Sequence, residues 1–344
     1  MMSLNPTEPS EPPPPDPHSV PSPEEHRTTR FHHIGPYVRL ARPDHWFKNV
    51  FMVPGILLAF FFDRTLEWTP AAGGIVLGFA AACLIASSNY VLNEILDARF
   101  DKYHPKKHVR PLVNGTARVS IAWGVWIVLG LAGIALGFLI DPRFAASGIA
   151  LWVMGLLYNV PPIRLKDRRY SDVLSESINN PIRLALGWYA TGVGAMPPLS
   201  IILAYWMFGS FLMGAKRFAE FRHINDPDRA SLYRKSFAWY DEERLIVSLF
   251  FYAAAFALMS GFFIARYRFE LILAAPVLAY AMAYYMHMAY KPDSPVQAPE
   301  KLHSQKKFML ILTVAVLLCA VLLFVDLPDL RHVFDPWIDP PAYP

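Results

Sequence analysis

The chain has 344 residues, of which 54% are hydrophobic and only 17% are charged, and its formal net charge is +4. The apolar residues come in runs of about twenty, the length that crosses a bilayer, which indicates an integral membrane protein. Basic loops between these runs account for the small positive charge, and without a basic aromatic module it does not indicate a nucleic-acid partner.

The N-terminal residues 1–30 are rich in Pro, Glu, Ser and His and contain no apolar run. This composition predicts a disordered, Pro-rich cytoplasmic tail and argues against a cleaved signal peptide. Cys83 and Cys319 both lie in apolar runs, so we expect buried thiols and neither a disulfide framework nor a metal motif.

Nine apolar runs within residues 37–325 predict an all-α, polytopic membrane helix bundle that forms a single transmembrane domain. The first run is the shortest, and a short external tail, residues 326–344, follows the last. The expected spans are 49–64, 72–96, 119–140, 144–160, 174–194, 197–216, 245–265, 269–289 and 307–325.

Lysine and arginine are distributed unequally between the two sides of this bundle. Of the 32 such residues, 26 fall on the side of the N-terminus and 5 on the other, with Arg183 inside a span. The positive-inside rule places the rich side in the cytoplasm. The sequence therefore predicts a protein of the cytoplasmic (inner) membrane with its polar loops inside and its C-terminus outside.

Asn93, Asp97 and Asp101 recur at every fourth residue at the end of the second expected span. Positions four apart drift by only about 40° around a helix, so the three side chains share one stripe. Carboxylate and amide oxygens at this spacing suit Mg²⁺ that also carries waters and phosphate oxygens. We expect a catalytic metal site here, and the alternative is an ordinary solvated helix end.

Cationic residues gather in the loops beside this stripe. Lys107 and Arg110 follow Asp101 closely, and Tyr158 and Lys166 flank the paired prolines after the fourth span. The topology rule and the lipid headgroups would explain any one of these cations. A cluster of cations next to metal-binding carboxylates, however, is the combination that binds a phosphorylated substrate.

The fifth expected span carries a second polar stripe, Glu176, Asn180 and Arg183, within about 60° on one helix face. This stripe predicts a polar cavity inside the bundle, or an internal Glu–Arg pair that satisfies itself.

The sixth expected span ends in Lys216, Arg217 and Glu220. These residues are candidates for binding phosphate, and the alternative is a positive-inside stop signal followed by a solvated loop.

These features together resemble the UbiA superfamily of intramembrane prenyltransferases. The resemblance rests on the nine spans, on the Asn93, Asp97 and Asp101 array and on the loop from Tyr158 to Lys166, and it covers nearly all of residues 37–325. Within that superfamily, three further elements resemble the decaprenyl-phosphate phosphoribosyltransferases. They are Arg42-Pro43-x-x-Trp46-x-Lys48-Asn49, His104-Pro105-x-Lys107-x-x-Arg110-Pro111 and Gly214-x-Lys216-Arg217-x-x-Glu220.

The resemblance implies a Mg²⁺-dependent transferase of cell envelope biosynthesis. In that family a polyprenyl phosphate attacks the anomeric carbon of phosphoribosyl pyrophosphate, and pyrophosphate leaves. It implies that Asp97 and Asp101, with Asn93, hold the Mg²⁺ that stabilises the departing pyrophosphate. The implied phosphate contacts are Lys107, Arg110, Lys216 and Arg217 for the sugar donor, and Lys48, Tyr158 and Lys166 for the donor or the lipid.

Departures from the family pattern keep two other functions open. The array begins with Asn93-Glu94 where the family usually has Asn-Asp, and Lys216-Arg217-x-x-Glu220 replaces the second Asp-rich motif of the prenyl-transferring relatives. That replacement favours phosphoribosyl transfer, whereas Asp172 and Glu176 could form a second metal site for prenyl transfer from a polyprenyl diphosphate to an aromatic or other polar acceptor. The third hypothesis is a non-enzymatic lipid transporter whose polar stripes line a pathway.

Overall fold

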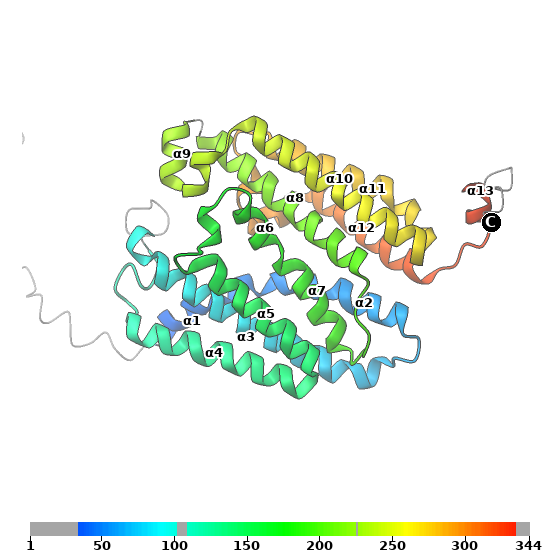
Figure 1. Ribbon diagram of the computed structural model, residues 1–344, viewed down its shortest axis with the longest axis horizontal. Helices are drawn as coiled ribbons and strands as arrows, with labels where there is room; N and C mark the ends of the chain where they lie inside the picture. Colours follow the sequence, from blue (N-terminus) through cyan, green and yellow to red (C-terminus); the bar gives the residue numbers. More distant parts are fainter. Residues whose placement is uncertain (1–33, 102–108, 225, 335–344) are drawn as a thin grey trace, which may run out of the picture.

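The computed structural model describes residues 34–101, 109–224 and 226–334. Across these residues the chain forms helices and the joints between them, and no strand occurs there, so the predicted all-α class is confirmed. The long helices run side by side along the longest axis of the molecule (Figure 1).

The helices differ widely in length, and several α-helices are preceded or linked by 3-10 turns. In chain order they are α1 (Gly35–Ala41), η1 (Pro43–Met52), α2 (Val53–Phe62), α3 (Trp68–Asp101), α4 (Val119–Ile140), α5 (Pro142–Asn159), η2 (Leu165–Asp167), α6 (Ser171–Ser177), α7 (Asn179–Ala190), α8 (Leu199–Ile224), α9 (Pro227–Tyr233), η3 (Lys235–Trp239), α10 (Glu242–Tyr267), η4 (Phe269–Ala274), α11 (Ala275–Ala289), η5 (Pro295–Gln297), η6 (Pro299–Ser304), α12 (Lys306–Phe324) and α13 (Leu330–Phe334).

Seven helical stretches within the described residues are long and apolar enough to cross a membrane, which supports an integral membrane protein. The expected spans 144–160 and 174–194 correspond to α5 and to the pair α6 and α7, which are not among the seven. The pair is interrupted at Ile178 and carries charged side chains, so neither half is a long apolar helix. The expected count of nine spans is therefore not confirmed.

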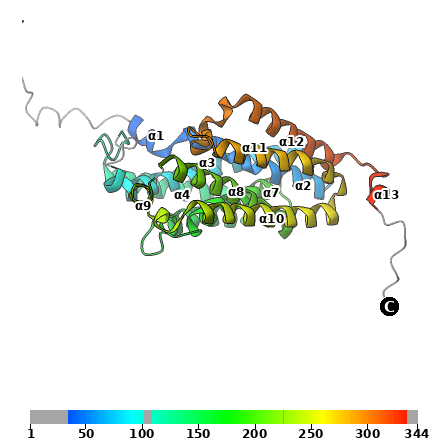
Figure 2. The ribbon, with the colours of Figure 1, turned by 90° about the horizontal axis from the view of Figure 1, so that it is seen from above.

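α7 lies at the centre of the bundle, where it contacts α2, α3, α5 and α8. On one side α3, α4 and α5 pack on one another, and on the other α8 packs on α10 and α11 on α12. α1 and α13 lie at opposite ends of the molecule (Figures 1 and 2). The end where α3 stops, and where α9 also lies, is called the loop end below.

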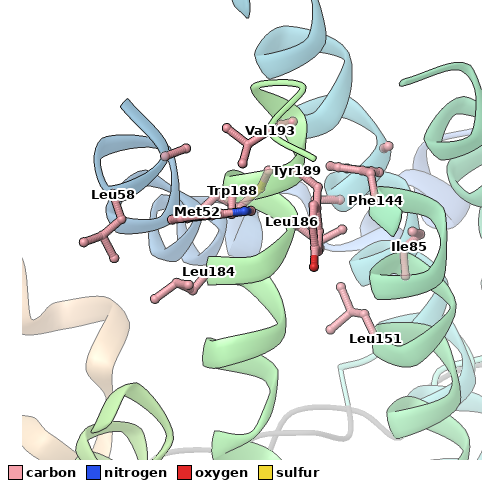
Figure 3. Packing of buried hydrophobic residues seen from close by; sticks show 14 of the residues in the cluster. Met52, Leu58, Ile85, Phe144, Leu151, Leu184, Leu186, Trp188, Tyr189 and Val193 are labelled. Carbon is pink, nitrogen blue, oxygen red and sulfur yellow. The ribbon is translucent and has the colours of Figure 1, made fainter. Parts of the chain in front are cut away.

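Two glycines allow η1 and α2 to pack directly on the backbone of α7. A Cβ atom at Gly187 would lie 1.9 Å from the carbonyl oxygen of Met52, and one at Gly55 would lie 1.9 Å from that of Leu184. Around them Met52, Leu184 and Trp188 form part of the main apolar core (Figure 3). This close approach fixes η1 and α2 against α7.

Replacing Gly187 by alanine should lower the melting temperature of the purified protein. The added methyl group would force the η1 and α7 backbones apart, and overpacking of this kind costs about 1–3 kcal/mol. Gly124→Ala on α4 is the matched control, because nothing lies within 4 Å of its Cβ position and alanine favours a helix by about 1 kcal/mol. Equal melting temperatures for the two variants would contradict the close packing.

Candidate active site

Asp97 on α3 is held by two cations from the loop that follows α5. Its two carboxylate oxygens accept hydrogen bonds from Lys166 Nζ at 2.7 and 2.8 Å, and Oδ1 also accepts one from Arg164 Nη2 at 3.0 Å. The Lys166 ammonium donates a further bond to Asn159 Oδ1 at 2.9 Å. Lys166 is buried and Asp97 is half-buried. Charge-assisted bonds in such surroundings are among the stronger interactions in proteins.

The sequence after α5 explains why this loop turns back onto α3. The helix ends at Asn159, and the following Pro161 and Pro162 cannot continue it. Arg164 then closes the loop, because its Nη1 donates to the Asn159 carbonyl oxygen at 3.1 Å and its Nε to Asp167 Oδ2 at 2.9 Å. Burial lowers the pKa of Lys166, and the contacts with Asp97 oppose that effect.

Asp101, one turn further along α3, is buried and pairs with Arg110. Arg110 belongs to the loop after α3, which is also held by a hydrogen bond from Leu112 N to Glu94 Oε1 at 3.2 Å. Glu94 therefore fixes this loop, although it occupies the position where the family pattern has aspartate. Lys107, predicted to contact phosphate, lies outside the described residues.

α3 runs unbroken through Asn93, Asp97 and Asp101, as the spacing predicts. In the described part of the chain, no group of three or more His, Cys, Asp or Glu is placed to hold a metal ion. The stripe instead offers two carboxylates and one amide. This set of hard oxygen donors fits Mg²⁺, which binds through one or two carboxylates and completes its shell with waters and phosphate oxygens.

A second charged network surrounds Arg217 on α8. Its guanidinium is fully buried and contacts three carboxylates: Asp172 Oδ2 at 3.2 Å, Glu176 Oε2 at 2.6 Å and Glu220 Oε2 at 3.2 Å. In this structure the Arg217 side chain is buried and each of its nitrogens already has a carboxylate partner, so contact with a donor phosphate stays a prediction that these partners do not favour. Arg217 instead ties α6 to α8.

The carboxylates of this network have further partners. Tyr240 Oη and Ser236 Oγ donate to Asp172 at 2.8 and 3.0 Å, and Tyr158 Oη donates to Glu176 Oε2 at 3.1 Å. Lys216 Nζ lies 3.9 Å from Glu220 Oε1. The predicted substrate contacts Tyr158, Glu176, Lys216 and Glu220 thus meet in one place, close to the Lys166 loop through Tyr158.

The predicted stripe of Glu176, Asn180 and Arg183 does not act as one unit. The helix is interrupted at Ile178, and the two charged residues join different networks. Glu176 pairs with Arg217, whereas Arg183 donates from Nε to Asn49 Oδ1 at 2.9 Å. The alternative of an internal Glu–Arg pair is therefore wrong. Asn180 packs against α8, where a Cβ at Gly209 would lie 2.4 Å from its Nδ2.

Lys48, another predicted phosphate contact, is half-buried in η1 and lies over an aromatic ring of α3. Its Nζ is 5.7 Å from the centre of the Tyr90 ring, and the guanidinium carbon of Arg42 lies at the same distance. Tyr90 precedes Asn93 by nearly one helical turn, so Lys48 lies beside the start of the array.

A pocket of about 270 Å³ lies at the loop end, next to the Asp97 cluster. It is predominantly basic, and it shares Arg164 with that cluster. Its lining consists of Arg99, Pro161, Pro162, Ile163, Arg164, Asp167, Arg168 and Lys235.

Several residues of these networks were not predicted as site residues. Asn159 and Arg164 flank the paired prolines of the loop between Tyr158 and Lys166, so their positions beside predicted site residues could have identified them. Tyr240 and Ser236 lie 68 and 64 residues from their partner Asp172. No local sequence pattern connects them with it.

Replacing Arg217 by glutamine should strongly destabilise the protein, because three carboxylates would lose their buried counter-charge. Breaking a buried ion pair costs about 3–5 kcal/mol. The matched control is Arg222→Gln on the same helix, where an exposed pair with Glu242 is lost and the cost is at most about 1 kcal/mol. Thermal unfolding in detergent compares the two, and an Arg217→Gln protein as stable as the control would show that the network is dispensable.

Residues 51–312 match the UbiA prenyltransferase family, which is more than half of the chain. Decaprenyl-phosphate phosphoribosyltransferase from Mycobacterium tuberculosis is 28% identical over 204 residues, which are 59% of this chain and 65% of that protein. Homogentisate phytyltransferase from Synechocystis is 30% identical over 194 residues, 52% of this chain and 59% of that protein. The chain thus spans less than two thirds of the length of these relatives.

The architecture agrees with solved structures. A UbiA homologue from Archaeoglobus fulgidus, solved with DMAPP and Mg²⁺, superimposes with a TM-score of 0.62 at 18% identity, covering 83% of this chain and 99% of that one. At an identity this low, the superposition shows that the two proteins share a fold and nothing further. Together with the match over residues 51–312, it establishes that the chain belongs to the UbiA prenyltransferase family.

Proposed function

We propose that the protein is a transferase that moves 5-phosphoribosyl from phosphoribosyl pyrophosphate to a polyprenyl phosphate and releases pyrophosphate. One observation carries this proposal: two carboxylates on one stripe of α3, Asp97 and Asp101, are neutralised by cations from two different loops. In such a cluster the carboxylates can bind a metal ion, and the cations can bind the oxygens of the pyrophosphate that the metal carries. The similarity to decaprenyl-phosphate phosphoribosyltransferase over 204 residues supports the choice of donor.

Asp97 and Asp101, with Asn93 as a neutral ligand, would hold the Mg²⁺ of this reaction. When bound, the ion supplies charge stabilisation for the leaving pyrophosphate. The structure of the Archaeoglobus fulgidus homologue with DMAPP and Mg²⁺ supports a divalent ion in a protein of this fold.

The cations around the carboxylates are the proposed phosphate contacts. Without a ligand, Lys166, Arg164 and Arg110 balance the charges of Asp97 and Asp101. Once the carboxylates have a metal to bind, the same cations are available for the oxygens of the donor's pyrophosphate, and the site stays close to neutral in both states.

The acceptor needs no dedicated base in this scheme. A phosphate monoester is already anionic near neutral pH, because its second pKa is about 6. Glu176, which Tyr158 connects with the Lys166 loop, is held by Arg217 and by Tyr158. We therefore assign Glu176 a positioning role: it holds Tyr158, which lies beside Lys166.

The proposal also gives an orientation. A water-borne sugar phosphate must reach the loop end, so this end faces the cytoplasm, which agrees with the excess of Lys and Arg in its loops. Residues 37–325 would form the catalytic domain in the inner membrane, with the tail 1–30 inside and residues 326–344 outside.

The partners of Asp172 and Glu176 bear on the alternative function, prenyl transfer. Both carboxylates could serve as a second metal site for a prenyl diphosphate, yet both are paired with Arg217, and Asp172 also accepts from Tyr240 and Ser236. The partner is also different from the cations at Asp97 and Asp101: Arg217 is fully buried, so it could not leave these carboxylates for the phosphate oxygens of a substrate. Membership of a transferase family argues equally against a transporter.

Membranes that contain the protein should transfer radiolabel from phosphoribosyl pyrophosphate into the lipid fraction when polyprenyl phosphate and Mg²⁺ are added. Asp97→Asn should reduce this rate by about 10²–10³-fold, since it removes stabilisation of the leaving group. Asp63→Asn, in the exposed loop at the opposite end, is the control and should keep full activity. Absence of label with the wild-type protein, together with alkylation of an aromatic acceptor by a polyprenyl diphosphate, would establish prenyl transfer instead.

A further inference from the structure

Arg183 is a buried cation in the apolar core of the bundle. It lies in the middle of α7 with 7% of its surface exposed, and the next residue, Leu184, is fully buried. Its hydrogen bonds go to two neutral groups, Asn49 Oδ1 at 2.9 Å and the carbonyl oxygen of Asn179 at 3.3 Å. No carboxylate among the described residues lies within ion-pair distance of it.

The other buried cations of the described chain differ from Arg183 in this respect. Four lysines and arginines are buried, and three of them have carboxylate partners: Lys166 pairs with Asp97, Arg217 with three acidic residues, and Arg268 with Glu270. A charge inside a membrane bundle is costly unless it is paired, and such residues usually serve a substrate or ion pathway. Arg183 is therefore the one buried cation of the described chain whose charge no neighbouring carboxylate balances.

The surroundings of Arg183 are suited to an anion. The ionisable groups that act on it are Tyr90, Tyr205 and Cys83, none of which is a carboxylic acid. Its Nη2 makes no hydrogen bond within the described residues and is not fully enclosed. Lys48 lies over the Tyr90 ring, and it forms no ion pair within the described residues, although its charge acts on Glu176 from a greater distance.

Asn49 connects the two cations. It follows Lys48 in η1, its Oδ1 holds Arg183, and its Nδ2 donates to Cys83 Sγ at 3.2 Å. The contact of Gly187 with the Met52 backbone fixes η1 against α7 and thereby sets this geometry. The guanidinium is thus pre-oriented before any ligand arrives, which reduces the entropic cost of binding.

We infer that Arg183 and Lys48 bind the phosphate headgroup of the lipid acceptor, in a subsite separate from the donor site at Asp97. This inference rests on the proposed function and assigns a different substrate to each group of cations. Arg183 lies on α7, beyond the interruption at Ile178, whereas the donor site is formed by the end of α3 and the loop after α5. α7 also carries Leu184, Leu186 and Trp188 of the main apolar core, so a lipid-borne anion suits this position better than a free one.

Binding of farnesyl phosphate, farnesol and inorganic phosphate to the purified full chain in detergent, without donor or metal, tests the inference. The wild type should bind farnesyl phosphate about tenfold or more tightly than farnesol, the factor expected for a charge-assisted contact. Arg183→Gln should remove this difference and leave the farnesol affinity unchanged, and Arg183→Lys should restore part of it. Arg229→Gln, which removes an exposed cation on α9, should change neither affinity.

Equal wild-type affinities for the phosphate and the alcohol would overturn the inference, and this comparison needs no variant to fold. Inorganic phosphate that displaces farnesyl phosphate at equal concentration would also overturn it, since the anion would then not be lipid-borne. The two proposals fail separately. Phosphate-dependent binding through Arg183 without label transfer refutes the phosphoribosyl reaction alone, whereas label transfer with unchanged phosphate affinity in Arg183→Gln refutes the subsite alone.

Discussion

Neutralisation of the two α3 carboxylates by cations from separate loops is the interaction on which the loop end of this bundle depends. Asp97 takes its counter-charge from Lys166 and Arg164, and Asp101 takes it from Arg110. Carboxylates at the end of an apolar helix are stable only with partners, so each loop is held where its cation meets α3. The same arrangement leaves the cations next to any phosphate that these carboxylates bind through a metal.

The cations inside the bundle divide into two kinds with different consequences. Arg217 is fully buried among three carboxylates, which balance its charge and join α6 to α8. Arg183 is almost as deeply buried but has only neutral partners. Burial alone therefore does not identify a substrate contact. A buried cation whose charge no carboxylate balances is the one that indicates a ligand.

Local periodicity predicted the parts of the structure that depend on a single helix. The stripe of Asn93, Asp97 and Asp101 lies on one helix because α3 is unbroken, and hydropathy located seven of the apolar helices. The expected stripe from Glu176 to Arg183 failed because α6 and α7 are separate helices and because Glu176 pairs with a residue 41 positions away. Partners at such separations are set by tertiary packing, which a single sequence does not reveal.

Binding of Mn²⁺, measured by electron paramagnetic resonance as a spectroscopic substitute for Mg²⁺, tests the exchange of cations at Asp97 most directly. With the carboxylates already paired, the ion alone should bind weakly, and pyrophosphate should strengthen its binding by about tenfold or more, because phosphate oxygens then replace the carboxylates as partners of the cations. Asp97→Asn should abolish this gain. Tight binding of Mn²⁺ without pyrophosphate, or a gain that persists in Asp97→Asn, would contradict the account.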